Sequence, residues 1–475
     1  MSKIHGMMDV GKRSMMNSQT ALQTTGHNIA NKSTEGYTRQ RVELQTAEPT
    51  GFGNNRIGNG SKTAAITRTT NPYLEKQIGK EQASLGYFQG QSDAMNRVEQ
   101  VYNEQSNKGL NTFVTDFFNS FRELSNNPES LATRTQVKET AQFLAQDFKR
   151  VHKQLNEIRN DIDQQVTTHI DEVNQFTSEI ADLNSKIQMV QNAGAPANDE
   201  RDRRDLLVKK LGEKINIRWA EGADGTVTIT AGNAALLVTG DDARKLSVRP
   251  TPETDSKGEG NVDIFYQSVK DGQTVKVTDQ MNGGAIGGLL QVRDQTISGL
   301  MTNVDKMAYS VASDVNAVHQ RGFDAHDRQG GEFFKMPNQV RHAAETFAIS
   351  DSIMRDPLRI AAAGQPGSPG DNRIANALSQ LQYENIMPDQ SSTLDEYYNS
   401  MVGEVGIQSR KAFSSHDSQK GIVDQLKNVR ESVSGVSLDE EATKLIEYQK
   451  AFDASARLIR TADEMFDTVL NLKRL

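Results

Sequence analysis

The chain has 475 residues, 54 basic and 62 acidic side chains, a formal net charge of -8 and no cysteine. This length allows two or three domains, each with its own core. Basic and acidic residues are interspersed without a Lys/Arg stripe, so we expect no nucleic-acid partner. The absence of cysteine excludes disulfides, thiolate metal sites and cysteine nucleophiles. The hydrophobic content of 35% favours an elongated, helix-rich shape over one compact globule.

The sequence carries no membrane or secretion signal of the usual kinds. No stretch approaches the roughly 20 apolar residues of a membrane-spanning helix. Residues 1–18 lack the continuous apolar core of a cleaved signal peptide. We therefore expect a soluble protein that does not use the general secretory (Sec) route.

The first thirty residues carry apolar or small side chains at alternating steps of four and three. This is the a/d repeat of a helix that wraps around a partner helix. Small residues in the repeat allow close backbone approach, and methionine tolerates imperfect packing. The predicted N-terminal seam consists of Ile4, Met8, Gly11, Met15, Ser18, Leu22, Thr25 and Ile29.

The C-terminal residues repeat the same steps. Two terminal helices with matching seams can pair within one chain or assemble with other copies. The periodicity alone leaves both alternatives open. The predicted C-terminal seam consists of Leu438, Ala442, Leu445, Gln449, Phe452, Ala456, Ile459, Asp463, Phe466 and Leu470.

The next segment in chain order, from about residue 72 to 192, has a helical pattern. Its longest apolar stripe runs from Leu144 to Val190 in steps of three or four. A helix of that length would extend roughly 70 Å at 1.5 Å per residue. We therefore expect a rod here, followed by a break at 193–199 and a short charged helix.

A period-two pattern then indicates a small β domain at about residues 212–280. Asp224-Gly225 and Asp271-Gly272 are hairpin signals between its alternating apolar residues. Helical patterning returns near Gly284 and continues, through a Gly/Pro-rich loop at 364–370, to the C-terminus. The expected fold class is mainly α with an inserted small β domain, elongated, with terminal helices forming a coiled-coil pair. The expected domains are terminal helices at 1–40 and 430–475, a helical rod domain with short β segments at 41–195 and 283–429, and an outer β domain at 196–282.

Few segments suggest chemistry. The loop at 319–332 gathers three acidic and two imidazole side chains, but its spacing matches no metal motif. Residues 51–60 are glycine-rich without the spacing of a nucleotide-binding loop. No serine lies in a nucleophile motif, and the other histidines lack acidic partners at motif spacing. We expect no enzyme activity, no cofactor and no metal.

The stretch that joins the first helix to a strand-like run carries a family resemblance. Asn28-Ile29-Ala30-Asn31, followed by Gly36-Tyr37-Thr38-Arg39-Gln40, resembles the N-terminal signature of the flagellar axial proteins, which form the rod, the hook and their associated junctions. Glu35 stands where that signature usually has proline. The side chains of the asparagines can bond to free backbone groups where the helix ends.

Three further stretches resemble the hook–filament junction members of this family. The similarity extends along nearly the whole chain. The segment at 323–372 is short relative to members that carry two outer domains. The stretches are Asn198-Asp199 with Arg203-Arg204-Asp205-Leu206-Leu207, then 283–295 with Asn316-Ala317-Val318-His319 and Gly322-Phe323-Asp324, and finally 434–452.

The resemblance implies a structural subunit of the bacterial flagellum that joins hook to filament. The implied partners are copies of itself in a ring or tube, the hook protein, a second junction protein on the filament side and a cytoplasmic export chaperone on the C-terminal helix. It also implies export through the flagellar type III apparatus, and terminal helices that stay disordered in the free monomer. The implied assembly interface comprises Ile4, Met8, Met15, Leu22, Asn28, Ile29, Asn31, Leu438, Leu445, Phe452, Ile459, Phe466 and Leu470.

Three alternatives remain at this point. A hook or rod protein of the same axial family would share the N-terminal signature. A cytoplasmic coiled-coil scaffold would explain the heptads without the β domain. A metal-dependent enzyme would use the loop at 319–332.

Overall fold

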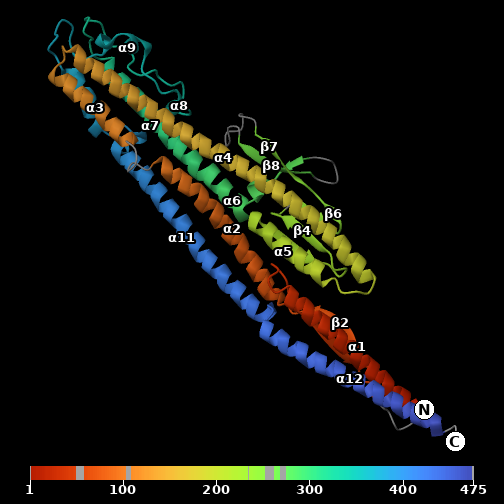
Figure 1. The fold of residues 1–475 in the computed structure, drawn as a ribbon. Helices are drawn as coiled ribbons and strands as arrows, with labels where there is room; N and C mark the ends of the chain where they lie inside the picture. Colours follow the sequence, from red (N-terminus) through yellow and green to blue (C-terminus); the bar gives the residue numbers. More distant parts are fainter. Residues whose placement is uncertain are drawn as a thin grey trace.

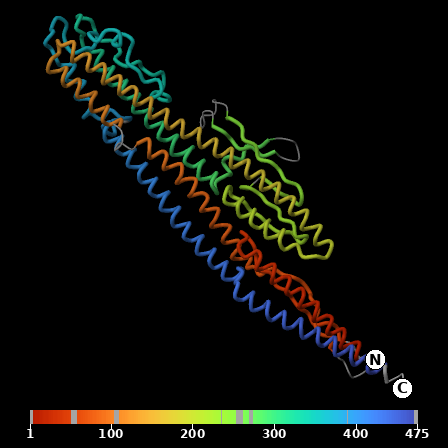
Figure 2. The backbone as a smooth tube through the Cα atoms, in the orientation of Figure 1, coloured from red at the N-terminus to blue at the C-terminus, as the bar shows by residue number. Residues whose placement is uncertain are grey.

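The computed structural model shows an elongated molecule in which long helices run side by side (Figure 1). The structure describes residues 2–49, 58–102, 109–233, 235–251, 261–267 and 274–472. Both chain ends lie at one tip of the molecule (Figure 2). No helix in the described ranges is long and apolar enough to cross a membrane. The predicted fold class, elongated and mainly α with small sheets, is confirmed.

Helices dominate the part of the molecule between residues 72 and 434, which we call the body. Helix α2 packs along α11 and α6, while α3 and α5 both pack on α4. A π-helical turn, η2 (Val292–Ile297), joins α6 to α7. The helices are α2 (Pro72–Val101), α3 (Leu110–Asn126), α4 (Leu131–Asn192), α5 (Asn198–Lys214), α6 (Gly284–Gln291), α7 (Ser298–His319) and α11 (Leu394–Ser434).

Helix α4 is the rod that the apolar stripe predicts. It has 62 residues, which corresponds to about 93 Å at 1.5 Å per residue. The side chain of Ser130 accepts a hydrogen bond from the Thr133 amide and so caps its first turn. The helix ends just before Gly194, whose φ of +80° a helix cannot continue. The stripe from Leu144 to Ile187 is buried, apart from half-buried Phe176.

Residues 217–276 form two small antiparallel sheets, in the orders β3-β4-β5-β6 and β7-β8-β9. The predicted turn at Asp224-Gly225 joins β3 to β4, and Gly225 has the positive φ, +76°, that such a turn requires. The other predicted turn, Asp271-Gly272, lies outside the described residues. The sequence did not predict β5, β6 or β7. The strands are β3 (Ile217–Glu221), β4 (Val227–Ala231), β5 (Ala235–Thr239), β6 (Asp242–Ala243), β7 (Leu246–Pro250), β8 (Val262–Gln267) and β9 (Thr274–Lys276), followed by the short helix η1 (Thr278–Gln280).

Two asparagines of α4 attach these sheets to the rod. The Asn184 amide donates to the carbonyl oxygens of Val227 and Gly240, and its oxygen accepts from the Val227 amide at 3.0 Å. Asn174 bonds in the same way to both backbone groups of Leu246. These side chains satisfy backbone groups at the first residue of β4 and on the edge strand β7, so each sheet is fixed to one face of the helix.

The segment between α7 and α11 differs from its prediction. Helical patterning was expected to continue there, but only short helices form, and isolated bridges join Phe323 to Gln329 and to Ala363. All residues from 320 to 372 are described, and none belongs to a sheet strand. Prolines at 337, 357, 366, 369 and 388 remove the backbone donors that a long helix needs. The helices are α8 (Ala343–Thr346), α9 (Asp351–Arg355), η3 (Pro357–Arg359), α10 (Arg373–Gln380), η4 (Leu381–Tyr383) and η5 (Pro388–Gln390).

The chain ends form a narrow projection from the body. Helix α1 (Ser2–Ala30) packs against α12 (Leu438–Leu472), and we call these two helices the terminal pair. A hairpin of β1 (Gln40–Thr46) and β2 (Ser61–Arg68) also packs on α1. The predicted start of the rod domain, at residue 41, falls within β1.

Candidate assembly interface

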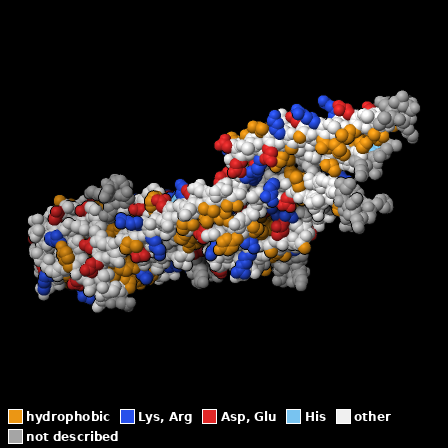
Figure 3. All heavy atoms as spheres, turned by 90° about the horizontal axis from the view of Figure 1, so that it is seen from below, with side chains coloured by type: hydrophobic (Ala, Val, Ile, Leu, Met, Phe, Trp, Pro, Cys, Tyr) orange, Lys and Arg blue, Asp and Glu red, His pale blue; other side chains and the backbone are white. Residues whose placement is uncertain are grey.

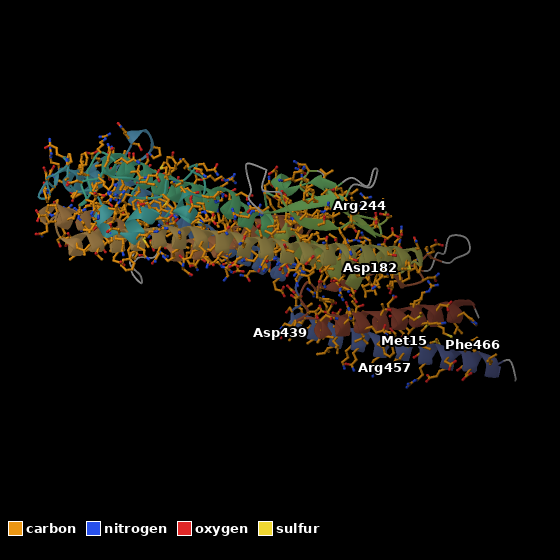
Figure 4. The ribbon with its side chains drawn as sticks, turned by 90° about the horizontal axis from the view of Figure 1, so that it is seen from above. Met15, Asp182, Arg244, Asp439, Arg457 and Phe466 are labelled. Carbon is orange, nitrogen blue, oxygen red and sulfur yellow. The ribbon has the colours of Figure 1, made fainter. Side chains whose placement is uncertain are left out.

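The terminal pair is antiparallel, with N-terminal residues of α1 beside C-terminal residues of α12. The ring of His5 lies edge-on to Phe466, with 5.4 Å between ring centroids. The hydroxyl groups of Ser14 and Ser455 are 2.7 Å apart. A Cβ atom placed on Gly11 would lie 2.8 Å from the Ile459 side chain, so the two backbones approach closely only because residue 11 is glycine. Figure 4 shows Met15, Arg457 and Phe466 on this projecting pair.

The structure brings the predicted seam of α1 together with half of the predicted seam of α12. The eight predicted α1 positions are all buried or half-buried. On α12, Leu445, Phe452, Ile459 and Phe466 are half-buried. Ala442, Gln449 and Asp463, at other positions of the predicted seam, are exposed in the single chain. Leu438 and Leu470 are also exposed, at 43% and 42%.

The missed half of the α12 seam lies one residue earlier in each repeat. Buried Glu441, Ser455 and Ala462, with half-buried Tyr448, occupy these positions. They too are spaced by seven residues and lie three or four residues from the apolar positions. A search for apolar residues missed this register because two members are polar. Two of these residues are buried against polar partners on α1, Ser455 against Ser14 and Glu441 against Asn28.

A second face of α1 contacts the hairpin. The Asn17 amide donates to the Ser61 carbonyl oxygen at 2.9 Å, and its oxygen accepts from the Thr63 amide at 3.0 Å. Ala21 and Thr24 continue this buried face. The N-terminal helix is therefore covered on two sides, by α12 and by the hairpin.

Asn28 connects the terminal pair to the start of the hairpin. It is 1% exposed. Its amide donates to the Gln40 carbonyl oxygen and to a Glu441 carboxylate oxygen, both at 2.9 Å. Its oxygen accepts from the Gln40 amide at 2.9 Å and from the Tyr37 hydroxyl at 2.7 Å. One signature residue thus joins α1, β1 and α12, and we call Asn28, Tyr37, Gln40 and Glu441 the Asn28 junction.

Asn31 and Gly36 shape the turn between α1 and β1. The Asn31 amide donates to the His27 carbonyl oxygen at 3.1 Å, and its oxygen accepts from the Thr34 hydroxyl. The first of these bonds reaches a backbone group at the helix end, as predicted from the asparagines. Gly36 has a φ of +85°, and a Cβ there would lie 3.1 Å from Leu206. Both the conformation and the space require glycine.

The signature residues after the turn bind acidic groups on α5 and α12. Thr38 donates its amide and hydroxyl to Asp202 at 2.8 and 2.7 Å. Arg68 forms an ion pair with the same carboxylate at 2.8 Å. Arg39 forms ion pairs with Glu441 at 2.9 Å and, on its other side, with Glu440 at 2.8 Å. The signature therefore fixes the terminal pair to the body through charged hydrogen bonds.

Burial changes the acidity of these groups. Burial raises the pKa of the Tyr37 hydroxyl, and the carboxylates of Asp199, Asp202 and Glu441 raise it further. The hydroxyl therefore stays protonated and donates to Asn28 at neutral pH. Burial also raises the pKa of Asp202, and the bonds from Arg68 and Thr38 offset part of that shift.

The acidic and imidazole groups at 319–332 are held by the local fold. His319 is fully buried, with Nδ1 bonded to the Gly331 carbonyl oxygen at 2.7 Å and Nε2 accepting from the Ala361 amide at 2.8 Å. Asp324 accepts from the amides of His326 and Arg328. These hydrogen bonds account for the positions of His319 and Asp324 without a bound ligand. The glycine-rich segment at 51–60 lies largely outside the described residues, with only 58–60 described.

Several of the other histidines lie near acidic groups, although not at the spacing of a catalytic motif. His27 lies 3.2 Å from Asp199, and this pair is 172 residues apart in sequence. His169 and His342 each meet a glutamate three residues later, Glu172 at 2.9 Å and Glu345 at 3.0 Å. A search for known catalytic motifs overlooks this i, i+3 spacing on a helix.

Family comparisons agree with this architecture. The model for the helical domain of the flagellar hook-associated protein FlgK matches residues 95–334, half of the chain. The chain belongs to this FlgK family. A model for the C-terminal region of the flagellar basal body rod FlgEFG proteins matches residues 431–472, which contain α12. The first match covers much of the helical body and the sheets, whereas the second is shared with rod proteins.

Relatives match over nearly their whole length. Flagellar hook-associated protein 1 of Bacillus subtilis (strain 168) is 28% identical, over 98% of this chain and 97% of that protein. The protein of the same name from Escherichia coli (strain K12) is 24% identical, over 96% and 97%. Its alignment extends over 537 positions, more than the 475 residues here, so it contains segments without a counterpart in this chain.

One solved structure has the same fold over most of this chain. The flagellar hook junction protein FlgK from Burkholderia pseudomallei superposes with a TM-score of 0.68 at 17% sequence identity. The match covers 75% of this chain and all of that one. At this identity the likeness concerns the fold alone.

Proposed function

We propose that the protein is a structural subunit of the bacterial flagellum that joins the hook to the filament. The match to hook-associated protein 1 over 98% of the chain carries this proposal. The match to the FlgK helical domain favours a junction protein over a hook or rod protein, whose models share the C-terminal helix. The buried contacts of His319 leave a catalytic role for its loop without support.

The proposed mode of action is self-assembly through the terminal pair. Five large apolar side chains stay exposed in the described part of α12, and neighbouring subunits in a tube would cover them. Figure 3 shows hydrophobic side chains between charged ones along this projection. The five are Leu438, Ile446, Met465, Val469 and Leu470, exposed by 37 to 58%.

The proposed setting is inferred from family membership. The subunit leaves the cell through the flagellar type III apparatus and takes its place outside, between the hook protein and a second junction protein. A cytoplasmic chaperone holds the C-terminal helix before export. The half-buried apolar residues of α12 supply the surface that such a chaperone would cover.

Replacing Leu445, Phe452 and Ile459 together with Asp tests the assembly step. Burying each such side chain contributes roughly 1.5 to 3 kcal/mol, and a carboxylate in its place adds a desolvation cost. The purified variant should keep the circular-dichroism signal of the β strands in the body. It should fail to join hooks that lack their cap proteins. Immunogold labelling of hook tips measures this directly, without export.

Two further variants separate pairing within the chain from contact between chains. Asp at Ile446 and Met465, which are 58% and 47% exposed, should leave α1 and α12 paired yet prevent incorporation. The matched control places Asp at Phe143 and Met189 of α4, exposed by 51% and 62%, and should incorporate normally. Normal labelling of hook tips by the Leu445, Phe452 and Ile459 triple variant would contradict the proposal.

A further inference from the structure

Three side chains that could bind a metal ion converge between helix α4 and the turn at α8. His152 comes from α4, while His342 and Glu345 come from the turn at α8. One nitrogen of each imidazole and one carboxylate oxygen lie within 4.8 Å of one another. Among the described residues, this is the group of His, Asp and Glu side chains close enough to share an ion.

The buried member of the group has an unused ligand atom. His152 is 5% exposed, and its Nε2 atom is buried without a hydrogen-bond partner. A buried imidazole nitrogen without a partner costs free energy, which a bound cation would recover. The His152 ring also lies edge-on to the His342 ring, with 5.9 Å between centroids.

The turn that carries the other two members is held in place by the body. Asp305 of α7 accepts hydrogen bonds from the amides of His342 and Ala344, both at 2.9 Å. His342 adopts a left-handed conformation with a φ of 63°. Its Nδ1 lies 3.0 Å from a Glu345 carboxylate oxygen. Glu345 is exposed, which leaves an open side through which an ion can enter.

We propose that His152, His342 and Glu345 bind one divalent cation of the zinc class, which clamps α8 to the rod helix α4. Two imidazoles and a carboxylate suit Zn²⁺, whereas Ca²⁺ and Mg²⁺ require sites made of oxygen. Three protein ligands leave a fourth position for water. The role is structural, and it goes beyond the proposed junction function.

To bind one ion, the ligand atoms of the three side chains must move slightly closer together. Ligand atoms around a tetrahedral Zn²⁺ lie roughly 3.3 Å apart, given metal–nitrogen distances of about 2.0 to 2.1 Å. His342 and Glu345 already meet this spacing. The remaining movement brings the two imidazoles together, and the exposed turn at α8 can make it more easily than α4.

The test uses the full chain without a histidine tag. Titration calorimetry with ZnCl₂ and metal analysis after gel filtration should show one Zn²⁺ per chain, and Co²⁺ should give the visible bands of a tetrahedral nitrogen and oxygen site. His342→Ala and Glu345→Gln should each weaken zinc binding by at least tenfold. Both positions are partly exposed, so circular dichroism should confirm that the variants fold.

A matched control removes a histidine–carboxylate pair that has no buried third ligand. His326 lies 3.1 Å from Asp356, and His326→Ala should bind zinc as the original chain does. Zinc should raise the thermal unfolding midpoint of the original chain and of this control, but not that of Glu345→Gln. Absence of stoichiometric zinc in the original chain, or unchanged binding in His342→Ala, would overturn the proposal.

Discussion

The core of the body and the seam of the terminal pair are built from different side chains. In the body, seven phenylalanines from distant segments meet, and all are fully buried. The rings of Phe334 and Phe347, for example, stack at 4.5 Å between centroids. The seven are Phe117, Phe118, Phe121, Phe148, Phe333, Phe334 and Phe347.

In the terminal pair, the most buried residues are small or polar. Its large apolar residues, such as Leu445 and Phe452, are only half-buried. Glycine, serine, threonine and asparagine bury little apolar area, so this seam contributes little hydrophobic stabilisation. The buried members are Gly11, Asn17, Ser18, Ala21, Thr24, Thr25, Asn28, Glu441, Ser455 and Ala462.

The difference indicates that the two regions are stabilised by different interactions. The body can fold from its own contacts, because it encloses a core of fully buried aromatic and aliphatic side chains. The terminal pair leaves large apolar side chains such as Ile446 and Met465 exposed, and the hydrogen bonds of the Asn28 junction hold its two helices together. Four experiments test this difference between the body and the terminal pair.

Limited proteolysis of the dilute chain should show the largest difference. Local opening of the terminal pair should cost little, while cleavage of the body core requires unfolding, typically at least about 5 kcal/mol. Protease should therefore trim roughly the first 40 and last 45 residues and leave one resistant fragment, identified by mass spectrometry. Equal protection of the ends and the body would refute the comparison.

Replacing single aromatic residues should give the next largest effect. Phe334→Ala should lower the free energy of unfolding by about 3 to 5 kcal/mol, because it opens a cavity in a closed core. Phe466→Ala should cost only about 1 kcal/mol, since that side chain is half-buried. Urea unfolding followed by circular dichroism measures both. Equal losses would mean that the terminal pair is as well packed as the body.

Acid should destabilise the body through His319. Burial lowers the pKa of this histidine to about 4 from its ordinary 6.5. Between these values the unfolded chain binds a proton that the folded chain does not, so stability falls as the pH drops from 6.5 to 4. The loss should reach about 3 kcal/mol. Protonation would also remove the acceptor of the Ala361 amide.

Urea unfolding at several pH values tests this expectation. His319→Gln, which cannot take up the proton, should flatten the pH dependence between 6.5 and 4. His326→Ala is the control, because His326 is exposed on the same loop, and it should keep the original slope. An unchanged slope in His319→Gln would assign the acid sensitivity to other groups.

Asn28→Ala should give the smallest effect, confined to the Asn28 junction. The change leaves buried groups of Gln40 and Glu441 without one partner, which costs about 1 to 3 kcal/mol. Hydrogen exchange of the Gln40 amide, which donates to Asn28, should accelerate by about tenfold or more. Asn31→Ala, at a half-buried position, is the matched control. Comparable acceleration in both variants would argue against a special role for Asn28.

Features set by residues close together in the sequence were predicted, whereas features set by contacts between distant segments were missed. The stripe from Leu144 to Val190 predicted the long helix, because one continuous buried face determines it. Asp224-Gly225 predicted a hairpin, because positive φ is a local requirement. Strands β5 to β7 were missed, since they are short and β7 is completed by hydrogen bonds from Asn174 of a distant helix. The predicted assembly contacts between subunits remain predictions.

The sequence by itself determined the helical rod, the terminal seam of α1 and the turn that follows it. These depend on periodicity and on the backbone preferences of Gly36 and Asn31, which act over a few residues. The tertiary structure decided the register of the α12 seam and the partners of Asn28, one of which, Glu441, is 413 residues away. It also decided the meeting of His152 with His342 and Glu345. No local pattern encodes such contacts, because a polar side chain becomes buried only when distant segments close around it.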